Sequence, residues 1–246
     1  MTYLRPVTKI GLLLFGALAL AATSCSQTPK RPAVAEQIAK TYGLDSFGQI
    51  EAIRYTFNLE VPGLNLSRSW VWEPKTGQVT FEGKAKDGSP VKVTYVRSQL
   101  DSQPANVKEE VDPGFINDQY WLVFPLHVYW DTKADVQDKG MQALPLGGGG
   151  SAKLVSVKYP SDGGYTPGDT WDLYIGKDNR VEQMFYHRGG PKKPSAVIVT
   201  WEGYKKAGPL LISTDHRGTA DGQPVRISFS NVAVKLKGSD AWMDAQ

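Results

Sequence analysis

Between Ile53 and Val61 every second residue is apolar, and polar side chains fill the positions between them. Successive side chains of a strand point to opposite faces, so this alternation predicts a strand with one buried and one solvated face. Pro62-Gly63 ends the segment. The alternation then resumes, and four side chains are expected on one face of a second strand: Leu66, Arg68, Trp70 and Trp72.

Further alternating segments follow, separated by short turns. Val79–Phe81 and Val91–Tyr95 complete a predicted antiparallel meander. A second series of strands is predicted beyond residue 150, and it ends in a hairpin across Ala220-Asp221-Gly222: Leu154–Tyr159, Trp171–Ile175, Val181–His187, Ala196–Trp201, Leu210–Asp215 and Val225–Leu236. A sheet of roughly ten twisted strands curls strongly or closes on itself.

A short stretch near the start of the strands has the spacing of a helix instead. Val34, Ile38 and Tyr42 recur at helical intervals, Pro32 suits the first turn, and Gly43 is a typical stop. The spacing predicts a short amphipathic helix whose apolar stripe covers another part of the protein.

The densest aromatic stretch of the chain is FINDQYWLVFPLHVYWD, residues 115–131. Asp112 is a suitable N-cap and is followed by proline, which predicts a helix over Pro113–Phe124. Pro125 is expected to end this helix, and Leu126–Trp130 is expected to continue as an extended segment. The stretch is too short and too polar to cross a bilayer, which needs roughly 20 apolar residues.

These elements predict a mostly β, α+β protein: one strongly curved antiparallel meander sheet, or half-barrel, with a short N-terminal helix. The central aromatic helix is expected to cover the concave face. A curled sheet beneath a helix leaves a cavity or groove. Eight aromatic residues are candidates for lining the groove, with ordinary core packing as the alternative for each: Trp70, Trp72, Phe115, Tyr120, Trp121, Phe124, Trp130 and Trp171.

Residues 1–24 have the pattern of a secretory signal peptide. Arg5 and Lys9 precede the apolar segment Ile10–Ala22, whose length is typical of a signal peptide and short for a membrane anchor. The four residues that end at Cys25 resemble a bacterial lipobox, although its usual leucine is replaced by alanine here. We therefore expect lipidation at this cysteine, and an ordinary signal with an incidental cysteine is the alternative.

Cys25 is the single cysteine of the chain, so no disulfide can stabilise the fold. Residues 25–31 are expected to form a lipidated tether, and 32–246 a single half-barrel domain. Ser26 follows the cysteine. By resemblance to enterobacterial sorting rules, this favours the outer membrane, with the protein facing the periplasm.

The net charge of the chain gives no sign of a nucleic-acid partner. Without Arg5 and Lys9 the basic residues fall from 28 to 26, against 25 acidic residues. Proteins that bind nucleic acids carry a clustered excess of Lys and Arg.

Few residues suggest chemistry. His127 and Asp131 are four residues apart and could form a general base if they shared a helix, but Pro125 argues against a helix there. His187, His216, Asp169 and Asp215 could in principle gather around a metal, yet no metal-binding spacing is present, and solvent-facing strand positions are the alternative. The sequence predicts no catalytic residue, no metal and no cofactor.

The order of signal, lipobox, short helix, meander, aromatic helix and second meander resembles the LolA/LolB-like half-barrel superfamily, which includes LppX-type lipoproteins. The resemblance concerns the order of elements in residues 33–236, and no ligand-binding residue can be carried over. It implies binding of acyl chains, lipids or lipidated proteins without catalysis.

The leading hypothesis is a lipid-anchored envelope protein that binds or carries an apolar ligand. One alternative is a structural lipoprotein with a filled core and a protein partner in the envelope. A second is an envelope hydrolase that uses His127.

Overall fold

The computed structural model describes residues 31–84, 88–162, 164–165 and 167–246. Residues 31–246 form one compact unit. The predicted signal peptide, Cys25 and most of the predicted tether lie outside the described residues. Of the helices that the structure describes, none combines the length and apolarity needed to cross a membrane.

The predicted first meander is confirmed. Its strands pair consecutively and antiparallel, and Arg68, Trp70 and Trp72 alternate with their neighbours on β2 as expected. The four strands are β1 (Ile50–Val61), β2 (Leu64–Glu73), β3 (Gln78–Lys84) and β4 (Pro90–Val96).

The second meander also forms, and it includes a strand that the alternation does not predict. That strand, β5 (Asp135–Ala143), is almost entirely exposed and polar. It is followed by β6 (Ser151–Lys158), β7 (Thr170–Ile175), β8 (Val181–His187) and β9 (Ala196–Thr200). The remaining strands are β10 (Lys205–Ala207), β11 (Leu210–Ile212), β12 (Asp215–Ala220), β13 (Gln223–Leu236) and β14 (Trp242–Asp244).

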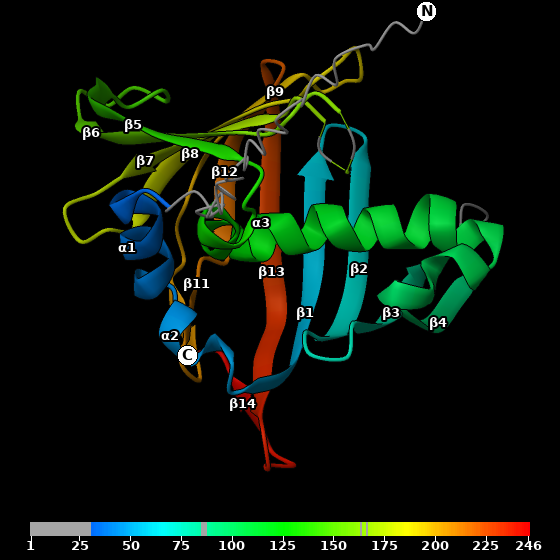
Figure 1. The fold of residues 1–246 in the computed structure, drawn as a ribbon. Coiled ribbons are helices and arrows are strands. Elements are labelled where there is room, and N and C mark those ends of the chain that lie inside the picture. Colours follow the sequence, from blue (N-terminus) through cyan, green and yellow to red (C-terminus); the bar gives the residue numbers. More distant parts are fainter. Residues whose placement is uncertain (1–30, 85–87, 163, 166) are drawn as a thin grey trace, which may run out of the picture. The chain divides into compact units, whose positions relative to one another are not determined.

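The long strand β13 joins the two meanders into one antiparallel sheet of 12 strands, because it pairs with β1 on one side and with β12 on the other (Figure 1). The prediction that Leu210–Asp215 forms the last hairpin with β13 is wrong, because β12 (Asp215–Ala220) takes that place. Asp221 and Gly222 both adopt positive φ, and this two-residue turn sets Ala220 opposite Gln223. Residues 210–212 pair with β10 instead, in a separate small sheet.

The predicted N-terminal helix is confirmed as α1 (Ala33–Thr41). Gly43 ends it with a φ of +100°, and a Cβ there would lie 2.6 Å from the Pro209 carbonyl oxygen. The other helical elements are α2 (Leu44–Phe47), the 3₁₀-helix η1 (Arg97–Ser102), the π-turn η2 (Val107–Val111) and the central helix α3 (Asp112–Trp130).

Two predictions about the central helix are wrong. Asp112 is not an N-cap, because the chain is already helical at Val111 and the carboxylate is used elsewhere. The helix also continues past Pro125 to Trp130. A kink at Val123 (φ −126°, ψ 26°) opens the turn before the proline, and dense packing of the flanking aromatic residues offsets the lost backbone hydrogen bond.

Helix α3 crosses β13, β1 and β2 on the face of the sheet that carries the core (Figure 1). Two aspartates on α3 are fully buried. Asp118 accepts hydrogen bonds from Arg68 Nε at 2.7 Å and from Arg68 Nη2. It also accepts one from the Trp70 indole at 2.8 Å. Burial raises the pKa of Asp118, and Arg68 opposes that rise.

Asp112, six residues before Asp118 at the start of α3, connects the helix to the sheet in a similar way. It accepts hydrogen bonds from Tyr95 Oη at 2.8 Å, from Arg97 Nε at 2.9 Å and from the Tyr165 hydroxyl. Each carboxylate thus meets an arginine from the region of the first meander, and the two points fix both the position and the rotation of α3.

Replacing Asp118 by alanine should lower the free energy of unfolding by about 3 kcal/mol, because Arg68 and the Trp70 indole would lose a buried acceptor. Chemical denaturation measures the change. Asp244→Ala, which removes an exposed partner of Arg54, is the control and should cost less than about 1 kcal/mol. Equal losses in the two variants would contradict the role assigned to Asp118.

Candidate ligand cavity beside the central helix

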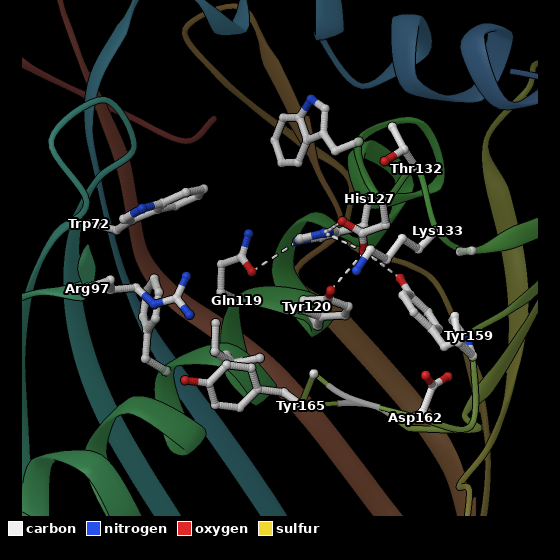
Figure 2. Close-up of a pocket in the computed structure, with 17 residues that line it drawn as sticks. Trp72, Arg97, Gln119, Tyr120, His127, Thr132, Lys133, Tyr159, Asp162 and Tyr165 are labelled. Carbon is white, nitrogen blue, oxygen red and sulfur yellow. Dashed lines mark hydrogen bonds and ion pairs between the residues drawn. The ribbon is translucent and has the colours of Figure 1, made fainter. Parts of the chain in front are cut away.

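A cavity of about 570 Å³, here called the first cavity, lies along α3 and reaches the end of this helix. Figure 2 shows the side chains that line it. Trp72 comes from β2 and Arg97 from η1, and α3 contributes Phe115, Ile116, Gln119, Tyr120, His127 and Trp130. The segment after α3 and the loop after β6 complete the wall with Thr132, Lys133, Ala134, Tyr159, Pro160, Asp162, Gly164 and Tyr165.

Asp131 is the centre of a hydrogen-bond network in this cavity. Its carboxylate accepts hydrogen bonds from Tyr120 Oη at 2.8 Å and from Tyr159 Oη at 2.6 Å. His127 Nδ1 lies 3.1 Å from both carboxylate oxygens, and its Nε2 lies 3.0 Å from the Gln119 amide (Figure 2). The Tyr120 ring stacks on the imidazole at 3.9 Å.

The network keeps Asp131 ionised. Burial favours the neutral acid, but hydrogen bonds from His127, Tyr159 and Tyr120 outweigh burial, and the pKa of Asp131 lies below its usual value. Burial, reinforced by the Asp131 charge, raises the pKa of Tyr120 and Tyr159. Both tyrosines therefore remain neutral donors in the physiological range.

A second cavity, of about 730 Å³, lies on the N-terminal side of the first. Ile116, Tyr120 and Tyr165 line both cavities. The second cavity reaches Trp171 on β7, Tyr186 on β8 and the segment after β8. The shared residues make the two cavities neighbours along α3, and the two together are here called the recess.

The structure separates the eight aromatic candidates into two groups. Trp72, Phe115, Tyr120 and Trp130 line the first cavity, and Tyr120 and Trp171 line the second. The other three are buried in the core: Trp70 bonds to Asp118, Trp121 contacts Trp171 and Trp201, and Phe124 stacks on Trp171.

The sequence did not single out Arg97, Gln119, Tyr159 or Tyr165 as cavity residues. Gln119 lies within the aromatic stretch, so its polar side chain amid aromatic neighbours was a usable signal. The other three come from turns and strand ends. Their convergence on α3 depends on tertiary contacts that no local pattern records.

The histidines outside the cavity have separate environments. His216 is fully buried against Trp201 at 3.9 Å, so the predicted solvent-facing position is wrong, and burial lowers its pKa to about 3. His187 lies on Phe185 and 3.2 Å from Asp172. In the part of the chain that the structure describes, no group of His, Cys, Asp and Glu could hold a metal.

No protein-family model and no curated protein matches the sequence. Among solved structures, the chain is similar to a DUF1329 family protein from Desulfovibrio piger, with 12% identity, coverage of 85% of this chain and 93% of that one, and a TM-score of 0.46.

Two further similarities are to a lipoprotein-sorting protein and to a lipoprotein. An outer membrane lipoprotein-sorting protein domain from Vibrio parahaemolyticus shares 9% identity over 84% of this chain and 93% of that one, with a TM-score of 0.45. LppX from Mycobacterium tuberculosis shares 11% identity over 82% of this chain and 96% of that one, with a TM-score of 0.30. At these identities the similarities concern the fold alone.

Asp131 should make the stability of the protein depend on pH. Because its folded pKa is depressed, its contribution is fully present above the ordinary aspartate pKa of about 3.9 and is lost as the pH falls through the lower folded value. Asp131→Asn should cost about 2 kcal/mol near pH 7, and the cost should shrink at acidic pH.

Denaturation of both proteins across the pH range measures this difference. Asp45→Asn, at an exposed position of α2, is the control and should leave the profile of the parent unchanged. A cost of Asp131→Asn that stays constant down to pH 3 would show that the carboxylate charge is not what stabilises the network.

Proposed function

We propose that the protein binds a ligand with a long apolar part in the recess between α3 and the sheet, as a carrier or binding protein of the cell envelope and without catalysis. The observation that carries the proposal is the first cavity. Its volume of about 570 Å³ lies in the range of small-molecule sites, roughly 300–1,000 Å³.

The composition of the wall supports this proposal. Trp72, Phe115, Ile116, Tyr120 and Trp130 supply apolar and aromatic surface, and the polar groups are concentrated around Asp131. An apolar surface with a few convergent polar groups is typical of a binding site, in which the polar groups orient the ligand. The cavity adjoins the second cavity, so a ligand longer than the first cavity has room to continue.

The pair of His127 and Asp131 is the observation that favours a hydrolase. Its geometry is less suited to catalysis than to fixing the cavity wall. The nitrogen that would activate a nucleophile, His127 Nε2, already contacts the Gln119 amide, while Nδ1 contacts a carboxylate that two tyrosines also hold.

An interaction role is supported by a different feature. β4 and β5 are the two edges of the large sheet, and Met141 on β5 is exposed. Edge strands offer unpaired backbone groups to a partner strand. A partner strand on β5 would not exclude ligand binding, because β5 does not line the first cavity.

The anchor is a proposal from the sequence, because Cys25 lies outside the described residues. Lipidation at this cysteine would hold residues 31–246 at a membrane surface of the envelope through a short tether. The second residue of the mature chain, Ser26, supports the outer membrane.

Ile116→Trp should weaken ligand binding at least about tenfold, equivalent to about 1.4 kcal/mol, because the larger side chain would fill the boundary that both cavities share. Titration of a fluorescent fatty acid into the chain that begins at residue 26, which retains the whole compact unit, measures the affinity. Thermal unfolding of the variant verifies that it folds.

The control is Leu64→Trp, which introduces the same side chain at the first residue of β2, a position that is 53% exposed. It should bind as tightly as the parent. Unchanged affinity in a folded Ile116→Trp variant would contradict binding in this recess, and absence of binding by the parent would contradict the proposed function.

Cys25→Ala should abolish incorporation of labelled palmitate and move the protein from the membrane fraction to the soluble or unprocessed fraction of envelope preparations. Fractionation and immunoblotting measure the shift, with Ser26→Ala as a neighbouring control that keeps the cysteine. Incorporation of palmitate that persists in the alanine variant would contradict lipidation at Cys25.

A further inference from the structure

The second cavity carries an excess of positive charge that the first cavity lacks. Lys158, Arg188 and Lys192 line it, and no carboxylate of the described residues forms an ion pair with any of them. The wall of the first cavity, by contrast, carries as many carboxylates, Asp131 and Asp162, as it carries basic side chains, Arg97 and Lys133.

The one carboxylate in the second cavity is occupied by other donors. Asp169 is buried, and its Oδ2 accepts a hydrogen bond from Tyr186 Oη at 2.8 Å. Its Oδ1 accepts one from the Gly189 backbone N–H at 2.7 Å. Asp169 thus fixes the turn after β8, and the three basic side chains keep their charge available to a ligand.

Two buried donors of the same cavity also lack acceptors. Arg188 Nε and Trp171 Nε1 are inaccessible to solvent and have no hydrogen-bond partner among the described residues. Both residues line the second cavity. Neither group can accept a hydrogen bond, and buried donors of folded proteins are nearly always paired. A water-sized molecule in the cavity reaches neither nitrogen, so a ligand would have to move neighbouring side chains to bond them. The anion site therefore rests on the three cations that line the cavity, for which a negatively charged oxygen is the fitting partner.

We propose that the second cavity binds the anionic headgroup of an amphipathic ligand, a carboxylate or phosphate, and that the apolar chain of the same ligand extends past Tyr120 and Ile116 into the first cavity. This assignment rests on the proposed function and names its ligand class. The guanidinium carbon of Arg188 lies 5.9 Å from the centroid of the Tyr186 ring, within the range of a cation–π contact.

The headgroup can be tested with two ligands that share one apolar chain. The protein for this test is the chain that begins at residue 26, with the neutral dye phenylnaphthylamine bound. The affinities of dodecanoate and dodecanol are measured from their displacement of the dye. Dodecanoate should bind about tenfold more tightly than dodecanol, as expected for hydrogen bonds to a charged group. The difference should fall as salt is added.

Arg188→Gln should reduce the preference for dodecanoate to about twofold or less, mainly through weaker binding of dodecanoate. The backbone hydrogen bond of residue 188 to Ser195 is retained in this variant, and its thermal unfolding confirms that it folds. Lys177→Gln is the matched control, because it removes the same charge from an exposed turn that lines neither cavity. Its preference should equal that of the parent.

Equal affinity of the parent for both ligands would overturn the headgroup site and leave the proposed function intact. Absence of dye binding and of displacement by either ligand would overturn the proposed function itself. A preference that falls equally in Lys177→Gln would assign the effect to overall charge and overturn the site. Inorganic phosphate tests whether the cavity binds a free anion. If phosphate raises the melting temperature as much as dodecanoate does, and this rise is lost in Arg188→Gln, the cavity binds a free anion and the proposal of an amphipathic ligand is overturned.

Discussion

The position of the central helix depends on two carboxylates buried beneath it. Asp112 and Asp118 are both shielded from water, and each pairs with an arginine and with neutral donors from the first meander or the loop near it. Burial of an ionised group is costly unless it is paired and hydrogen-bonded. A helix that slid or rotated would break both sets of bonds, so the aspartates fix one register among many that an apolar helix could adopt.

That register determines what the recess contains. With Asp112 and Asp118 turned towards the first meander, Ile116 and Tyr120 face the cavities, and Trp121 and Phe124 pack into the core beside Trp171. The Asp131 network then holds the end of the helix against Tyr159. An apolar surface with its polar groups at defined places suits a ligand with two unlike ends, and the excess of donors and cations in the second cavity extends the same principle.

Local sequence rules predict most of the strands, miss β5 and the hairpin partner of β13, and fail at the central helix. Pro125 was expected to stop the helix, since proline cannot donate the backbone hydrogen bond and crowds the preceding turn. In the structure a kink at Val123 relieves the crowding, and the turn after the proline is buried among aromatic neighbours. Only because the helix continues do His127 and Asp131 face each other. The spacing of His127 and Asp131 predicts this pair, but the helix end expected at Pro125 argues against it.

The sequence by itself determined the fold class, the meander of β1–β4, the N-terminal helix and the aromatic character of the segment that covers the sheet. These features follow from periodicity and turn residues, which act over a few positions. Tertiary structure alone decided that β13 joins the two meanders, which aromatic residues line a cavity, and that Arg188 Nε and Trp171 Nε1 meet no acceptor among the described residues. Each of these depends on contacts between residues far apart in the chain, where many pairings satisfy the local pattern and packing selects one.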